Sequence, residues 1–308
     1  MPKQDKRHFV PAALIGQFAQ NPNSLRLRKS RISVVRLTPP RSFLTAAENV
    51  GHARDLYRGS PFPGSDNDSY FSTFEKFAQE PVSRIIEELG RGIEFDSWIK
   101  LAGYVTSQFT RAPELERSLD ELAETSEWSR DQMDVGYILN TQRVSSAVVR
   151  ARWEFMRTPK DLILNDRGLA PVQFGDWGAR GYFFPLRKRF GLRIAGGPHP
   201  KSVAWNGERW LIDVPVANIS VEQTDNLNCW TWCGAVDEVY GSSAELLSDT
   251  QPLAELMKND LPNLVSYNQG AKLLSLPASQ RIEDEMLLIS TLGGINAPVD
   301  GDPTLYVI

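Results

Sequence analysis

The stretch Asp161-Leu162-Ile163-Leu164-Asn165-Asp166 marks the point at which the pattern of this chain changes. Before it, apolar residues recur mainly at helical spacing. After it, short apolar runs are separated by turn residues, which indicates strands. Such runs cover residues 181–186, 192–194 and 209–212, and a further helix is expected over 219–235. Helices followed by strands predict an α+β fold.

Toward the N-terminus, one helix has a clear buried face and ends before Pro113. Its apolar positions are Trp98, Leu101, Ala102, Val105 and Phe109. Residues 42–57 and 131–156 are also expected to be helical. We therefore expect one domain over residues 1–308. Its helical part, at about 42–158, packs on a mixed or antiparallel sheet built mainly from about 159–308, which an N-terminal strand at 32–37 joins.

Composition limits the class of protein. The chain has 308 residues, of which 41% are hydrophobic and 23% charged, as in ordinary globular proteins. The net charge of −4 argues against a uniformly basic nucleic-acid coat but allows a local basic surface. No apolar run is long enough for a transmembrane helix, and residues 1–7 lack an apolar leader. Cys229 and Cys233 are expected to be reduced thiols, so we expect a cytoplasmic protein without a membrane partner.

Three ionisable residues stand at the ends of predicted elements. Asp166 closes a strand, where a carboxylate either enters a cleft or starts an Asx-turn. Glu80 precedes Pro81 and either acts chemically or stabilises the start of a helix. His8 lies between charged residues and an apolar run, as a catalytic or a core-edge histidine. These three are the candidate catalytic residues.

Amides and one arginine are the candidates for substrate binding. Tyr104, Gln108 and Arg111 lie on one face of the predicted helix. The Gln108 amide can hydrogen-bond to the edge of a base, and the Arg111 guanidinium can bind a phosphate. The alternative is a glutamine that anchors a loop and an arginine bonded to nearby carbonyls. Asn226 and Asn228 occupy helix positions that disfavour asparagine, so each reads a substrate or fixes a loop.

Two basic clusters are candidates for contact with a DNA backbone, although both also fit solvated loops. The first contains Arg26, Arg28, Lys29 and Arg31, and the second contains Arg187, Lys188 and Arg189. No metal-ligand spacing is present, and neither a phosphate loop nor a dinucleotide fingerprint follows a predicted strand. We therefore expect neither a metal nor another cofactor.

The order of five motifs resembles a large bacterial family defined as a domain of unknown function. The motifs are the segments 8–11 (H-F-V-P), 74–81 (F-E…E-P), 108–113 (Q-F-T-R-A-P), 165–166 (N-D) and 183–186 (F-F-P-L). Members typically open with H-[FY]-V-P and carry Q-x-x-R-x-P and S-D-x-P. Here Pro171 follows Asp166 at a longer spacing. The resemblance implies a site and extends to accessory and defence proteins of bacteria.

From these residues we expect a DNA-acting hydrolase, namely a DNA glycosylase that excises a modified base in anti-phage defence, with double-stranded DNA as partner. This chemistry needs a carboxylate and base-reading amides but no metal. The alternatives are a metal-dependent nuclease, with Glu94 and Asp96 as further carboxylates, and a non-catalytic sensor of nucleotide or protein. We further predict that His8, Glu80, Gln108, Arg111 and Asp166 converge.

Overall fold

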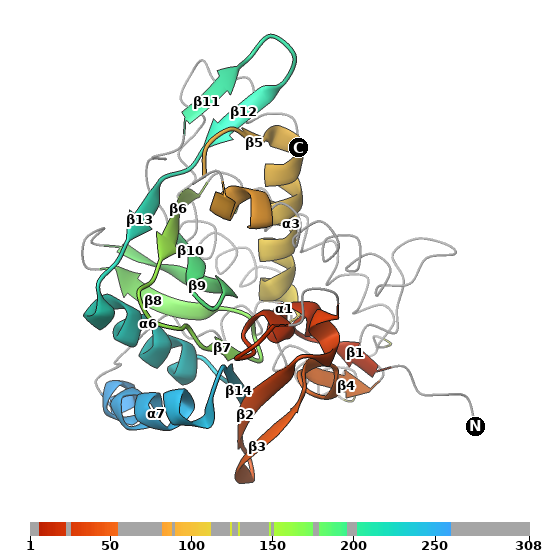
Figure 1. Cartoon of the computed structure of the whole chain (residues 1–308), viewed down its shortest axis with the longest axis vertical. Coiled ribbons are helices and arrows are strands. Elements are labelled where there is room, and N and C mark those ends of the chain that lie inside the picture. The colour runs from red at the N-terminus through yellow and green to blue at the C-terminus, as the bar shows by residue number, and fades with distance from the viewer. Residues whose placement is uncertain are drawn as a thin grey trace.

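A computed structural model describes residues 6–22, 26–54, 82–87, 90–111, 151–174, 179–195 and 202–259, with single residues 124, 129 and 148. Within these ranges the chain is an α+β protein of helices and mostly antiparallel strands (Figure 1). No helix in the described part is long and apolar enough to cross a membrane.

The largest described sheet has the order β13-β6-β10-β9-β8. Its strands are β6 (Arg152–Arg157), β8 (Ala170–Phe174), β9 (Ala179–Arg187), β10 (Phe190–Ala195) and β13 (Val216–Asn218). All neighbours are antiparallel except β13 and β6, which run parallel. β10 is buried along its whole length because it lies in the middle of the sheet.

A second sheet joins distant parts of the chain in the order β3-β2-β14-β7. Its strands are β2 (Arg31–Leu37), β3 (Pro40–Ala46), β7 (Leu164–Asn165) and β14 (Glu238–Gly241). β14 pairs antiparallel with β2 and with β7. Strand β2, near the N-terminus, therefore pairs directly with β14, near the C-terminal end of the described residues. The β2–β3 hairpin projects from the lower edge of the molecule in Figure 1.

Two small sheets complete the described strands. β1 (Lys6–His8) pairs with β4 (His52–Arg54), and the order β11-β12-β5 joins β11 (Ser202–Trp205), β12 (Trp210–Asp213) and β5 (Ile93–Glu94). In Figure 1 these two sheets lie at different ends of the molecule. They therefore cannot contribute to the same local site.

α-Helices pack around the sheets, and residues 82–87 are helical in addition to four labelled helices. These four are α1 (Ala12–Gln17), α3 (Phe95–Thr110), α6 (Val221–Cys233) and α7 (Ala244–Asn259). Short 3-10 turns, η1 (Leu27–Lys29) and η2 (Ala47–Asn49), flank the N-terminal hairpin. α3 buries the face that its sequence predicts, and its Trp98 contacts Trp153 of β6 with ring centroids 5.6 Å apart. Aromatic packing of this kind fixes α3 against the large sheet.

The predicted division into a helical first part and a sheet-rich second part is not what the structure displays. Strands β4, β5 and β6 and most of β3 lie within residues 42–158, and helices α6 and α7 lie beyond 159. Residues 42–54 form no α-helix, because β3 pairs with β2 over its full length and is followed by the 3-10 turn η2 and strand β4. Most of the predicted helix 131–156 lies outside the described residues, but its last part is strand β6, where Trp153 and Phe155 alternate with half-buried polar residues at strand period.

Candidate functional site

The N-terminal motif is held by the β1–β4 pair. His8 lies opposite His52, and the two rings meet edge to face with centroids 5.4 Å apart. The next residue, Phe9, donates its backbone N–H to the carbonyl of Gly51 at 2.8 Å. Val10 is fully buried and Pro11 precedes the first turn of α1. The motif thus ties the start of the described chain to the residues that follow η2.

The imidazole of His8 lies in a positively charged setting. Burial, together with the charges of His52, Arg28 and Arg111, lowers its pKa to about 4, and a backbone hydrogen bond with Glu48 opposes this shift. His8 is therefore neutral at pH 7. Its Nε2 atom is buried and has no hydrogen-bond partner among the residues that the structure describes.

The C-terminal end of α3 meets this motif. Arg111 donates from Nη2 to the backbone carbonyl of His8 and is only 2% exposed. Gln108 is fully buried and donates from Nε2 to the Ser107 hydroxyl at 3.2 Å. Phe109 packs edge to face on Tyr182 of β9 with centroids 4.8 Å apart, which seats the helix end on the large sheet. The structure therefore places Arg111 as an arginine bonded to a nearby carbonyl, one of the two readings of the sequence.

Gln108 also touches the turn that follows β7. Gly168 has φ +73°, and a Cβ atom placed there would overlap Gln108 Oε1 and lie 3.4 Å from Cγ2 of Val10. Oε1 has no hydrogen-bond donor within the described residues, although it is buried. Three segments far apart in sequence, those of Val10, Gln108 and Gly168, therefore meet at one point.

Asp166 stands in the same turn, and its carboxylate binds the start of β14. Its Oδ1 accepts from the backbone N–H of Val236 at 2.9 Å, and its Oδ2 accepts from Asp237 at 2.7 Å and Glu238 at 3.1 Å. Burial raises the pKa of Asp166 to about 7, against the effect of these three hydrogen bonds. Both oxygens are thus engaged by backbone donors, so the carboxylate fixes the loop before β14.

Glu238 continues the polar network from this loop to the N-terminal motif. Its Oε2 accepts from the Tyr240 hydroxyl at 2.9 Å and from the backbone N–H of Gly51 at 3.0 Å. Its Oε1 accepts from Nε of Arg36 at 2.9 Å. Because Gly51 in turn receives the N–H of Phe9, a continuous set of hydrogen bonds runs from Asp166 to the residue next to His8.

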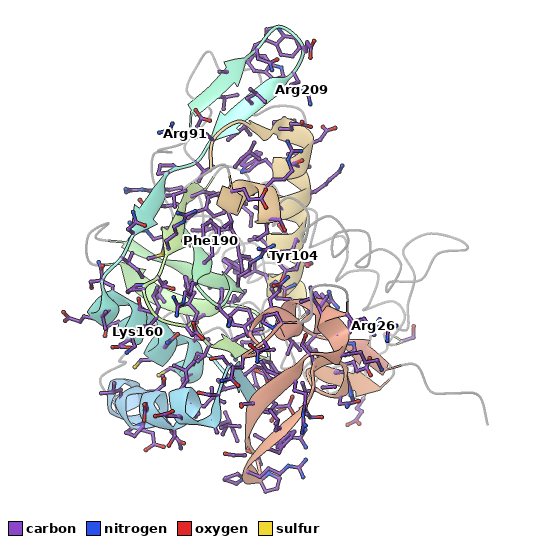
Figure 2. The ribbon with its side chains drawn as sticks, in the orientation of Figure 1. Arg26, Arg91, Tyr104, Lys160, Phe190 and Arg209 are labelled. Carbon is purple, nitrogen blue, oxygen red and sulfur yellow. The ribbon has the colours of Figure 1, made fainter. Side chains whose placement is uncertain are left out.

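The predicted convergence can now be described residue by residue. His8, Gln108, Arg111 and the turn containing Asp166 are joined by the contacts above, and Tyr104 is buried one turn earlier on α3 (Figure 2). Glu80 lies outside the described residues, so its place in the site is not established. Gln108, Arg111 and Asp166 are at most 2% exposed. A ligand that contacts them must therefore displace protein neighbours.

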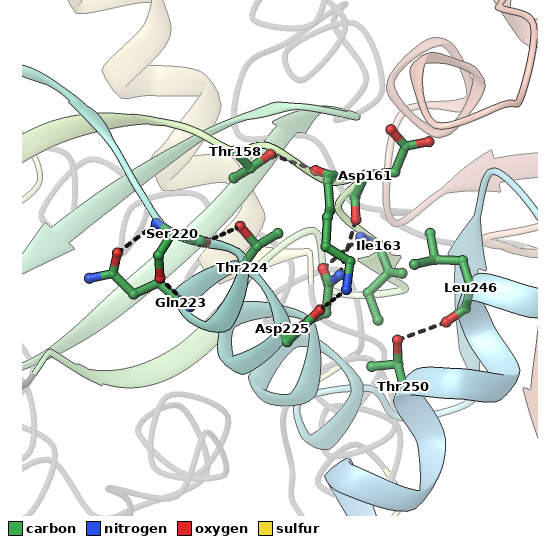
Figure 3. A network of polar contacts seen from close by, with 11 residues as sticks. Thr158, Asp161, Ile163, Ser220, Gln223, Thr224, Asp225, Leu246 and Thr250 are labelled. Atoms are coloured by element: carbon green, nitrogen blue, oxygen red, sulfur yellow. Dashed lines mark hydrogen bonds and ion pairs between the residues drawn. The ribbon is translucent and has the colours of Figure 1, made fainter.

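The two asparagines of α6 have different surroundings. Asn226 is exposed. Asn228 is buried, and its Oδ1 accepts from the backbone N–H of Ile163 at 3.0 Å while its Nδ2 donates to the carbonyl of Asp161 at 3.0 Å (Figure 3). Asn165 adds a second link, because its Nδ2 donates to the carbonyl of Thr231 at 2.9 Å. Asn228 thus fixes the segment leading into β7.

The first basic cluster lies close to the site. Arg28 is near enough to His8 to affect its pKa, and Arg26, Arg28 and Arg31 are exposed. Lys29 forms an ion pair with Glu48. Figure 2 places Arg26 beside α1. This surface is therefore continuous with the N-terminal motif.

The second basic cluster is held by protein contacts. Arg187 donates to the Ser83 hydroxyl, Lys188 to the carbonyl of Gln20 at 2.9 Å, and Arg189 to Asp161 at 3.0 Å. Lys188 and Arg189 are nonetheless at the surface, with Arg189 exposed. All four residues of the first cluster are exposed, whereas Arg187 and Lys188 of the second are only partly exposed, so the first is more accessible to a partner.

Sequence reasoning missed Glu238, Tyr240, Gly51 and Gly168 as members of this network. A glutamate next to Val239 and Tyr240 in a predicted short strand was the available signal, because a buried carboxylate needs partners. Asn-Asp followed by Gly at position 168 signals a tight turn with positive φ. No sequence pattern indicates that Gly51 would supply a backbone donor to a residue nearly two hundred positions away.

Comparison with known proteins gives one match. The profile of a family described as "Protein of unknown function (DUF4238)" matches residues 6–245. The chain belongs to the DUF4238 family. The matched region includes His8, Gln108, Arg111, Asp166 and Glu238, so the whole network lies within the family domain. Neither a curated protein nor a solved structure gives a significant match.

Proposed function

We propose that this DUF4238 protein is a DNA-acting hydrolase that cleaves an N-glycosidic bond, with a modified base of phage DNA as its target in the bacterial cytoplasm. One observation carries the proposal: the basic residues of η1 adjoin a neutral, half-buried histidine near the meeting point of three distant segments. A polyanion is attracted to such a surface, and a neutral imidazole can accept a proton beside it.

In the proposed reaction, water attacks C1′ of the deoxyribose while the bond from C1′ to the base nitrogen breaks. The water proton passes to the neutral imidazole of His8, and the leaving base takes the electron pair of the broken bond. Oε1 of Gln108 is an acceptor for an amino group of the extruded base. Glu80 supplies the carboxylate that stabilises positive charge on the sugar. Asp166 has a positioning role, because its oxygens already bind the loop before β14.

The test is incubation of the full chain with modified and unmodified duplexes, followed by mass spectrometry for free base and cleavage of abasic sites by alkali. We expect free base and abasic sites from at least one modified duplex, unchanged by EDTA. His8→Gln should abolish release of the base while the variant still binds DNA. Free base released equally by His8→Gln and by the parent would contradict the assignment of His8.

The addition of EDTA in this experiment distinguishes the glycosylase from a metal-dependent nuclease, which would lose its activity. Among the described residues no group of three His, Cys, Asp or Glu side chains is placed to hold a metal ion together. Glu94, one of the carboxylates considered for such a centre, pairs instead with Arg209 and lies 3.8 Å from Arg84. Strand scission that EDTA abolishes and Mg²⁺ restores would replace the glycosylase proposal by this one.

A non-catalytic sensor is the second candidate, and the burial of Gln108 and Arg111 favours it. Both side chains are almost completely buried, and Arg111 is bonded to the carbonyl of His8, which suits a binding module whose ligand meets only the surface. A sensor binds DNA or a nucleotide without releasing base. Binding measured by fluorescence anisotropy, with no free base from any duplex tested, would support this candidate over the enzyme.

A further inference from the structure

The β2–β3 hairpin carries an arrangement of charge that the site above does not use. Residues 26–48 contain six basic residues and one acidic residue, in a chain of net charge −4. Two of the basic residues, Arg36 and Arg41, are direct partners across the hairpin. Like charges at directly opposed positions destabilise a pair of strands unless something neutralises them. Four of these six belong to the first basic cluster already described, and Arg36 and Arg41 are the two that lie within the hairpin beyond it; residues 31–46 hold no acidic residue. The hairpin therefore extends the basic surface of this acidic protein beyond η1.

The two arginines differ in how their charge is balanced. Arg36 is paired with Glu238, which faces it from β14. Arg41 is exposed on the edge strand β3, and no carboxylate of the described residues forms an ion pair with it. Its neighbour is instead an aromatic ring, since its Cζ lies 5.0 Å from the centroid of Phe43. Arg41 is thus a cation that the protein orients without neutralising.

Phe43 fixes how the guanidinium is presented. Its ring is half-buried against the core and has Arg36 within 5.7 Å as well as Arg41. A guanidinium above a ring uses its face for the cation–π contact and leaves its in-plane N–H groups for another acceptor. The planar fork of N–H groups matches two oxygens of one phosphate.

We propose that Arg41, positioned by Phe43, binds a backbone phosphate of double-stranded DNA, so that the β2–β3 hairpin is a contact surface additional to η1. This inference rests on the proposed function, because it takes DNA as the partner. Charge complementarity selects the partner, and the position of β3 at the sheet edge makes the hairpin accessible (Figure 1). Because this contact involves no base, it should increase the affinity for every DNA sequence by the same amount.

The experiment measures binding of the full chain to a fluorescent 20-base-pair duplex by anisotropy over a salt titration. Arg41→Gln should reduce the slope of log K against log salt by about 0.9, which corresponds to roughly eightfold weaker binding at 0.1 M salt. Arg41→Lys keeps the charge and should keep the slope, but it should bind more weakly than the parent because it lacks the fork. Phe43→Leu should weaken binding with the slope retained.

Arg91→Gln is the matched control, because Arg91 is exposed at the end of the molecule that carries β11 and β12 (Figure 2). It should bind like the parent. If the parent binds DNA and Arg41→Gln matches it at every salt concentration, the hairpin contact is wrong while the proposed function stands. If the parent itself does not bind the duplex at low salt, both the proposed function and this inference are overturned.

Discussion

At the scale of single residues, Asp166 shows how a buried carboxylate serves the fold. Its two oxygens accept three backbone N–H groups from residues 236–238. Asp166→Asn replaces one acceptor with an NH₂ group that faces a donor. We expect the free energy of unfolding to fall by about 1–3 kcal/mol. Urea denaturation checks this, with Asp225→Asn on the surface of α6 as control. An Asp166→Asn variant as stable as the parent would contradict the role in fixing the loop.

The pKa values of Asp166 and His8 predict opposite dependences of stability on pH. Folding raises the pKa of Asp166 from 3.8 to about 7, so its contribution is fully present below about pH 4 and is lost as pH rises through 7. Folding lowers the pKa of His8 from 6.5 to about 4, so its contribution is present above 6.5 and is lost as pH falls through 4. Between pH 4 and 6.5 the two effects offset each other.

Single substitutions separate the contributions of His8 and Asp166 to the pH dependence of stability. In His8→Gln only Asp166 still titrates, so the free energy of unfolding of this variant should fall as pH rises from 4.5 to 6.5. Asp166→Asn leaves the effect of His8 and should gain stability over the same range. Each change is on the order of 2 kcal/mol relative to the parent. Urea midpoints at the two pH values measure it, and parallel profiles for both variants and the parent would refute the assignment.

Gly168 permits the contact between the β7 turn and α3. Gly168→Ala adds a Cβ atom that overlaps Gln108 Oε1 and is also strained by the positive φ. Gly92→Ala is the matched control, because Gly92 has φ +60° and no atom within 4 Å of its added Cβ. The control should cost about 1–2 kcal/mol from strain alone. Gly168→Ala should cost clearly more in thermal or urea unfolding, and equal costs would show that the contact is unimportant.

At the scale of elements, α6 is fixed to the strand β7 by side-chain amides rather than by apolar contact alone. Asn228→Ala removes the acceptor for Ile163 and the donor to Asp161 in a buried place, so we expect a loss of about 2–4 kcal/mol. Asn226→Ala, two residues earlier and exposed, should change stability by less than about 0.5 kcal/mol. Chemical denaturation of the two variants side by side decides whether the buried amide is structural.

The elements also show what the sequence could predict. α3 and α6 were predictable, because one has a regular apolar face and the other a Ser220–Gln223 capping box. β3 was not, because its exposed residues follow no alternation, and its pairing with β2 determines its conformation. In the site, Gln108 and Arg111 stood out at a helix end. Glu238 did not, because its partners Gly51 and Arg36 come from remote segments that no local pattern identifies.

At the scale of the whole molecule, charge is unevenly distributed, and the two basic clusters should differ in DNA binding. Replacing Arg26, Arg28, Lys29 and Arg31 with Gln should weaken binding at all sequences alike and flatten its salt dependence. Replacing Arg187, Lys188 and Arg189 should have a smaller effect on binding, since each is held by Ser83, Gln20 or Asp161. Fluorescence anisotropy over a salt titration measures the DNA affinity of both variants. A larger loss of affinity in the second variant would show that the second cluster is the main DNA-binding surface.

The position of β14 between β2 and β7 has a consequence for synthesis on the ribosome. β2 ends at Leu37, whereas its central partner is complete only at Gly241. At about 5–20 residues per second, the nascent hairpin waits roughly 10–40 s for that partner. During this interval one edge of β2 offers unsatisfied backbone groups to other chains. The native contacts of this sheet thus have high sequence separation, which favours slow folding and gives chaperones a defined segment to protect.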